Sequence, residues 1–312
     1  MRSWILPLLF SLAVALGGAA QQIHLPERYS RVKAENGLII GWHARVRDRQ
    51  ARQIGVYDRD GKLLLDLGLL SLVPGAKQVS VHDVSARPGS FIAVAAIYRK
   101  DDLSNPAAAL LCFDFSGNPL TSVALAPSRE IWRLTVDSEG NIWTLTAGAG
   151  GLDPSQAPMV VAYTVSGAVI REIFKRTEFP LQASQIQENA QVGAPGFGHT
   201  ENAIWFWLAG STDEVTFRPD GSSVHRSQTG LPGASKHETM QRVLLTDSGT
   251  LLAQIWDEQE PSFFSRSAAM GVWRSFAAPC SKCILIGADS GKALFIKLQQ
   301  GSSDIYAAPL PE

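Results

Sequence analysis

The chain has 312 residues, of which 45% are hydrophobic and 18% charged, and 28 Lys and Arg stand against 29 Asp and Glu, a formal net charge of -1. An apolar fraction of this size can form a large core, which excludes general disorder. The near-neutral charge argues against a nucleic-acid partner, because such binding depends on neutralising phosphates, and 3 Cys are too few for a disulfide-built scaffold.

The first twenty residues have the pattern of a secretory signal peptide. Arg2 supplies an early positive charge, residues 4–16 are apolar apart from Ser11, and small residues follow up to Ala20. This pattern predicts a signal peptide over residues 1–20 and a single mature domain over 21–312. An uncleaved membrane anchor is the alternative, but the apolar stretch is shorter than the roughly 20 residues that span a bilayer. We therefore expect a periplasmic or secreted protein with no membrane contact after cleavage.

Short β-rich runs recur around turn residues in the mature chain, and no stretch keeps a helical spacing. One class of unit is a strand, a turn with Gly or Asn, and a second apolar strand. Its turn residues are Gly37, Gly89, Gly140, Asn202, Gly249 and Gly291. A second class, in which an aromatic strand turns into a more polar one, lies between them and has its clear copies at residues 56–61, 113–117, 163–167 and 217–221. The alternation predicts four strands per period, two inner and two outer.

Six such sheets, fanned around an axis, would bury one another's faces and leave only short outer edges. Six units over residues 21–312 average about 49 residues each, which is typical of propeller blades. We therefore predict an all-β, six-bladed β-propeller with four antiparallel strands per blade; a two-sheet sandwich would not need the long period. The predicted blades cover approximately residues 31–80, 81–130, 131–190, 191–240, 241–280, and 281–312 together with 21–30. In the last of them the N-terminal strand pairs with the C-terminal strands and closes the ring. Residues 272–276 and 305–306 are the expected remnants of the aromatic unit in the fifth and sixth blades.

Residues 134–143, followed by residues 163–167, resemble a blade of the NHL-type six-bladed propellers, whose broader clan includes the senescence-marker-protein and gluconolactonase group. The pattern covers nearly the whole mature chain, but only the third blade matches the motif closely. The chain most resembles an exported bacterial member of this clan. The resemblance implies a functional site where loops gather around the central channel on one face.

Counting back seven residues from the turns places His82, Arg133 and Arg242 near the entry of three inner strands, with His199 near the same rim. Trp42, Trp256 and Asp257 end second strands beside polar loops, whereas Trp143, Trp205 and Trp207 fit the gaps between blades as core residues. We expect these rim residues to bind a protein or a small anionic ligand, because guanidinium groups hold planar anions bidentately. Ordinary solvated loop charges are the alternative.

The resemblance also raises a metal-dependent lactonase-like hydrolase as the alternative function, in which acidic and amide side chains in the channel hold a divalent cation. Residues 31–37 depart from the Gly-Glu-Gly-Pro-like stretch of that group, and Glu35 is expected to be a solvated hairpin residue. No His pair has zinc-ligand spacing. The sequence therefore predicts no catalytic residue, no metal and no cofactor.

Cys280 and Cys283 form the one sharp local motif. Their spacing permits a redox dithiol, half of a zinc site or a local disulfide. No second pair exists for a four-thiolate site, and the motif follows Pro279 and precedes a strand rather than opening a helix. In an exported chain we expect a small disulfide that fixes this loop, and we expect Cys112 to be a buried apolar residue.

Overall fold

The computed structural model describes residues 22–46, 52–101, 106–125, 130–147, 157–179, 196–208, 213–232, 241–246, 248–256, 260–267 and 271–311. The signal-peptide prediction therefore falls outside the described residues, as does Asp257. Helix is confined here to α1 (Leu69–Leu72) and the 3-10 helix η3 (Arg176–Glu178). No helix in this part of the chain is long and apolar enough to cross a bilayer.

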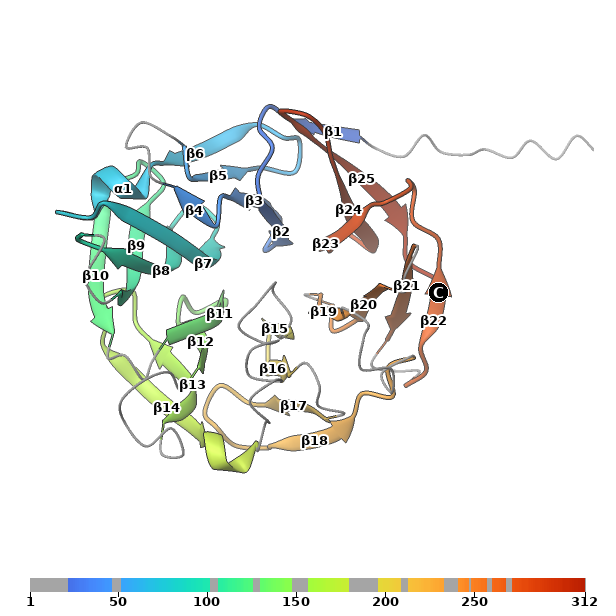
Figure 1. Ribbon diagram of the computed structural model, residues 1–312. Helices are drawn as coiled ribbons and strands as arrows, with labels where there is room; N and C mark the ends of the chain where they lie inside the picture. Colours follow the sequence, from blue (N-terminus) through green and yellow to red (C-terminus); the bar gives the residue numbers. More distant parts are fainter. Residues whose placement is uncertain are drawn as a thin grey trace, which may run out of the picture.

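Six antiparallel sheets stand around a central axis, as Figure 1 shows, and the predicted six-bladed propeller is confirmed. Blade one contains β2 (Arg31–Glu35), β3 (Leu38–Trp42), β5 (Ile54–Tyr57) and β6 (Leu63–Leu67). Blade two contains β7 (Gln78–Arg87), β8 (Phe91–Arg99), β9 (Ala107–Asp114) and β10 (Pro119–Leu125). Blade three contains β11 (Glu130–Val136), β12 (Ile142–Ala147), β13 (Pro158–Tyr163) and β14 (Val169–Lys175).

The other three blades follow the same order from the axis outward. Blade four contains β15 (Gly196–His199), β16 (Ile204–Trp207), β17 (Asp213–Phe217) and β18 (His225–Gln228). Blade five contains β19 (Gln241–Leu245), β20 (Leu251–Trp256), β21 (Pro261–Arg266) and β22 (Arg274–Phe276). Blade six contains β23 (Ile284–Asp289), β24 (Lys292–Leu298), β25 (Ser303–Pro309) and, at its outer edge, β1 (Gln22–Leu25).

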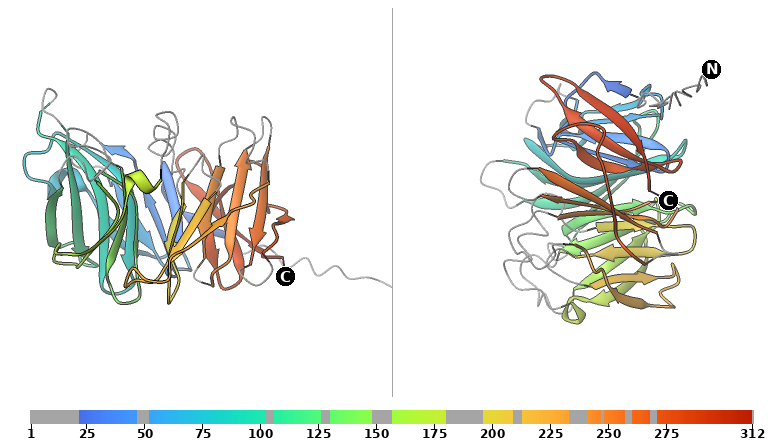
Figure 2. Two further views of the ribbon diagram at one scale, coloured as in Figure 1. Left: turned by 90° about the horizontal axis from the view of Figure 1, so that it is seen from below. Right: turned by 90° about the vertical axis from the view of Figure 1, so that its right-hand side faces the viewer.

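The first strand of each blade lies nearest the axis, and the strands run between the two faces of the ring (Figures 1 and 2). We call the upper face the one where β2 begins and β3 ends, at the paired residues Arg31 and Trp42. The turn at Asn36 and Gly37 marks the lower face. Residues that start an inner strand therefore meet at the upper end of the central channel.

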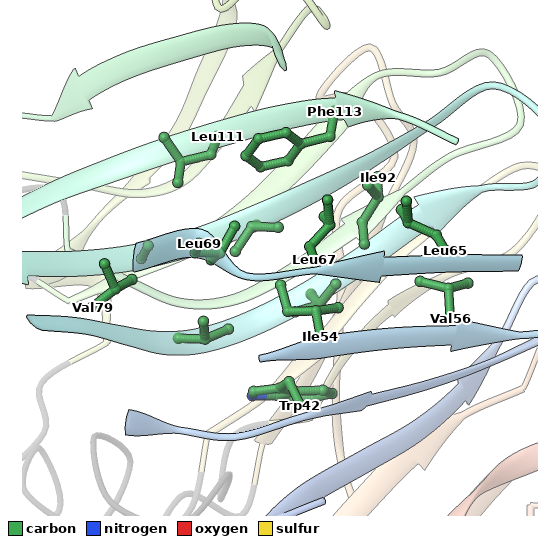
Figure 3. Packing of buried hydrophobic residues seen from close by; sticks show 14 of the residues in the cluster. Trp42, Ile54, Val56, Leu65, Leu67, Leu69, Val79, Ile92, Leu111 and Phe113 are labelled. Carbon is green, nitrogen blue, oxygen red and sulfur yellow. The ribbon is translucent and has the colours of Figure 1, made fainter. Parts of the chain in front are cut away.

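Apolar residues fill the wedges between neighbouring blades, because neither face of a four-stranded sheet can be left in water. Figure 3 shows the wedge between blades one and two, where Trp42 and Ile54 of one blade pack in the same cluster as Val79 and Ile92 of the next. Trp143, Trp205 and Trp207 are at most 3% exposed, which confirms them as core residues.

The ring closes through β1, which pairs with β25 from Gln22 opposite Tyr306 to Leu25 opposite Ser303. The predicted closure is therefore confirmed. Tyr29, in the link to β2, is fully buried between blades six and one. Its ring lies directly over the backbone of Gly41 and Gly55, where a Cβ atom would stand 2.2 Å and 2.0 Å from Tyr29 atoms. Only glycine leaves room for this ring at the two positions.

Blade five differs from the sequence prediction. Its third strand is β21, which carries Phe263 and Phe264, and residues 274–276 form the fourth strand rather than the third. The prediction missed β21 because two adjacent aromatic residues break the alternation that marks a strand with one solvated face. In blade six the expected Ile305 and Tyr306 do lie on the third strand.

One further strand was not expected. The short β4 (Arg45–Val46) pairs with the upper end of β7, and Val81 donates its backbone N–H to the Ala44 carbonyl. This segment extends the inner edge of blade two at the upper face.

A double-variant cycle tests the closure. The hydroxyl oxygens of Tyr29 and Tyr57 lie 2.8 Å apart in the core and share a hydrogen bond. We expect Tyr29→Phe and Tyr57→Phe each to lower the free energy of unfolding by about 1 kcal/mol, the range for a buried hydrogen bond, in urea titrations. The double variant should lose little more than either single variant. Tyr306→Phe, at a half-exposed position of β25, is the control. Additive losses would contradict a direct bond between the two hydroxyl groups.

Candidate functional site

A cavity of about 240 Å³ lies at the upper end of the central channel. All six blades contribute to its wall, because the inner strands meet there. Its charged lining residues are Arg31, Lys33, Asp83, Arg133 and Arg242. Its apolar lining includes Trp42, Phe197, Leu244, Trp256, Ile284, Ile286, Ile296 and Leu298.

Three arginines from three different blades meet in this cavity. The guanidinium of Arg31 donates to the carbonyl of His82 at 3.0 Å, and that of Arg133 to the carbonyl of Trp132 at 2.7 Å. Arg242 reaches from blade five to blade one and donates to the carbonyl of Val32 at 3.3 Å. Each of these three hydrogen bonds goes to a backbone carbonyl oxygen, which is a neutral acceptor.

Burial makes the charged form of these arginines unfavourable. It lowers the pKa of Arg31 and of Arg133, and it lowers the pKa of Arg242 to about 10. The charge of Arg133 lowers the pKa of Arg242 further, and Asp83 opposes the shift in all three. Arg31 and Arg242 therefore bring to the cavity positive charge that the described part of the chain only partly neutralises.

The carboxylates of Asp83 and Glu35 already have partners. Asp83 accepts the backbone N–H of Val84 at 3.0 Å and that of Leu134 at 2.9 Å, which ties blade two to blade three. Lys33 lies 2.9 Å from Glu35 and 3.6 Å from Asp83. Neither Arg31 nor Arg242 lies within ion-pair distance of a carboxylate in the part of the chain that the structure describes.

Below the cavity, a polar network crosses the channel. Glu35 accepts hydrogen bonds from Ser85 at 2.7 Å and from Thr135 at 2.5 Å, and Thr135 Oγ1 lies 2.8 Å from His199 Nδ1. The side chain of Glu35 is only 14% exposed, so the expectation of a solvated hairpin residue is wrong. The inner strand turns this side chain toward the axis, where neighbouring blades surround it.

Irregular strands help to aim these side chains. β11 has a β-bulge between Ile131 and Arg133, and β7 has one between Val81 and Asp83. A bulge adds one residue to a strand and redirects its side chains. Trp132 is thereby buried between blades three and four while the adjacent Arg133 lines the channel.

Four of the predicted site residues meet in the cavity: Trp42, Arg133, Arg242 and Trp256. His82 lies beside it, with Nδ1 3.3 Å from the Ile131 carbonyl and 3.5 Å from Glu130, and burial lowers its pKa. His199 belongs instead to the lower network.

Sequence reasoning missed Lys33 and Asp83 as lining residues. The signal for Lys33 was present, since Arg31, Lys33 and Glu35 alternate along an inner strand and must share one face. Nothing in the sequence near Asp83 indicated that its carboxylate would bind the backbone of the next blade.

Cys280 and Cys283 form a disulfide with Cα atoms 5.7 Å apart, and Cys112 is a buried free thiol. Cys283 is fully buried, and its carbonyl accepts a hydrogen bond from Gln254, a cavity residue, at 3.3 Å. The loop is thereby connected to the wall of the channel.

The sequence matches no protein-family model, and no curated protein matches it either. Solved structures do resemble the chain. A candidate exported protein from Bacteroides fragilis has a TM-score of 0.52 at 8% identity, over 94% of this chain and 95% of that one. Virginiamycin B lyase from Staphylococcus aureus has a TM-score of 0.48 at 12% identity, over 93% and 99% of the two chains. TolB from Acinetobacter baumannii has a TM-score of 0.45 at 9% identity, over 93% and 64%.

Identities this low show the fold alone, and the fold shared with the Bacteroides fragilis protein agrees with the six blades described above. The resemblance to the NHL and gluconolactonase clan stays a prediction.

Glu35→Gln tests the lower network. This change removes the nearer of the two carboxylates beside Lys33, and we expect it to lower the free energy of unfolding by about 2 kcal/mol in urea titrations. Adding Lys33→Met should restore part of the loss, because it removes the ammonium group that has lost its nearest carboxylate. Glu201→Gln on the exposed lower face is the control, with an expected effect below about 0.5 kcal/mol. Equal losses of unfolding free energy in Glu35→Gln and Glu201→Gln would contradict a stabilising role of this network.

Proposed function

We propose that this protein is an exported propeller that binds a small anion, a carboxylate or a phosphate, in the cavity at the upper end of its channel. The observation that supports this most directly is the position of Arg31 and Arg242, whose partly buried guanidinium groups line the channel without a carboxylate partner among the described residues. A buried charge is unfavourable unless it is paired. A bound anion would provide that pair.

The charge of the lining supports an anion over a cation. Arg31, Lys33, Arg133 and Arg242 face Asp83, the one carboxylate among the lining residues that the structure describes. A divalent cation would be repelled from this position, so the site as arranged does not favour the metal-dependent lactonase alternative. The described residues contain no group of three or more His, Cys, Asp or Glu side chains that could hold a metal ion.

Two features support export. Residues 1–20 have the composition of a signal peptide, and the Cys280–Cys283 disulfide suits an oxidising compartment such as the periplasm or the cell exterior.

Calorimetric titration of the purified mature chain with phosphate and with acetate, at constant ionic strength, tests the proposal. We expect binding in the wild type, and we expect Arg242→Gln to weaken it at least tenfold because one guanidinium is lost. Arg218→Gln, on the exposed lower face, should leave the affinity unchanged.

The stability of the Arg242→Gln variant shows whether Arg242 serves ligand binding or the stability of the fold. Without ligand, Arg242→Gln should be as stable as the wild type within about 1 kcal/mol, since it removes a buried like charge as well as one hydrogen bond. Neither anion binding the wild type, or equal binding to the wild type and Arg242→Gln, would contradict the proposal.

A further inference from the structure

One side of the cavity is apolar. At the upper end of the inner strands, blades one, three and five place Arg31, Arg133 and Arg242. Blade six places Ile284 and Ile286, two residues apart on β23, in the wall. The lining therefore has an apolar sector on blade six, between the arginines of blades five and one.

Part of this apolar sector is not covered by protein. Ile284 and Leu298 of blade six are only partly buried although they line the channel, as is Leu244 of blade five. Ile286 and Ile296, which also line the cavity, are buried, with 1% and 2% of their surface exposed. Apolar surface left in contact with water is unfavourable, and a ligand that covers it gains affinity.

Two tryptophan rings add aromatic surface to the cavity wall. Trp256 is half-buried, and Trp42 is 3% exposed with an indole N–H that has no hydrogen-bond acceptor among the described residues. Both line the same cavity. The accessible part of the Trp256 ring offers apolar contact to a ligand that has both a polar and an apolar part.

We infer that the ligand is an amphipathic monocarboxylate, an acid with an apolar tail, whose carboxylate binds Arg31 and Arg242 while its tail covers Ile284 and Leu298. This inference rests on the proposed function and narrows it. A planar carboxylate can accept two parallel hydrogen bonds from a guanidinium. Inorganic phosphate would satisfy the cations but leave the apolar wall in water.

A series of straight-chain acids tests the inference: acetate, butyrate, hexanoate, octanoate and decanoate, titrated into the mature chain below their micelle concentrations. Each buried methylene should strengthen binding about fourfold until the cavity is filled. Affinity should therefore rise steeply along the series and then level off.

Ile284→Asn should flatten this dependence on chain length, so that decanoate gains less affinity over acetate than it does in the wild type. Leu298→Asn is a second variant of the same wall, should the first fail to fold. Leu120→Asn, an exposed position on the outer strand β10, is the matched control and should bind the whole series as the wild type does.

The outcomes distinguish the two proposals. If acetate and phosphate bind through Arg242 but affinity does not rise with chain length, the amphipathic ligand is wrong and the anion site stands. If affinity rises equally in the wild type, Ile284→Asn and Leu298→Asn, the tail lies elsewhere and the inference is overturned. If no anion binds, the proposed function fails and this inference fails with it.

Discussion

The structure depends on one constraint: a four-stranded sheet cannot cover its own two faces. Six of them must stack around an axis, and the stack must close, because an open ring would leave two apolar faces in water. Closure is achieved by β1 on the edge of blade six and by Tyr29, which fills the wedge between the last blade and the first. Every inner strand is then held at the axis, whatever side chains it carries there.

This constraint explains how three like charges come to lie together. Arg31, Arg133 and Arg242 are far apart in sequence, and nothing local draws them to one place. Ring closure brings their strands to a common axis, and the apolar wedges provide the free energy that opposes their mutual repulsion. A chain selected only for stability would gain by replacing one of them with an apolar residue of similar size. The anion that we propose as the ligand would offset part of this repulsion.

The same packing connects the channel to the rest of the ring. Asp83 binds the backbone of blade three, and Gln254 of blade five accepts the N–H of Leu285 in blade six at 2.9 Å. Both side chains also line the cavity. Residues that form the wall of the site therefore also hold neighbouring blades together.

The fold could be predicted because its signals are local. A strand, a turn and a second strand lie within about ten residues, and their repetition identifies the blades. Arg133 and Arg242 could be predicted for the same reason, since each was counted from the turn of its own blade. Glu35 could not, because its burial depends on Ser85 and Thr135 in two other blades. Sequence periodicity shows which side chains face the axis, but it does not show which of them meet across it.

A crystal structure with 6-bromohexanoate would test the central claim most directly, because bromine identifies its own position by anomalous scattering. The account predicts one strong bromine peak in the channel beside Ile284 and Leu298, with the carboxylate on the guanidinium groups of Arg31 and Arg242. Bromine peaks confined to the outer surface, with the channel of the saturated crystal free of ligand, would contradict it.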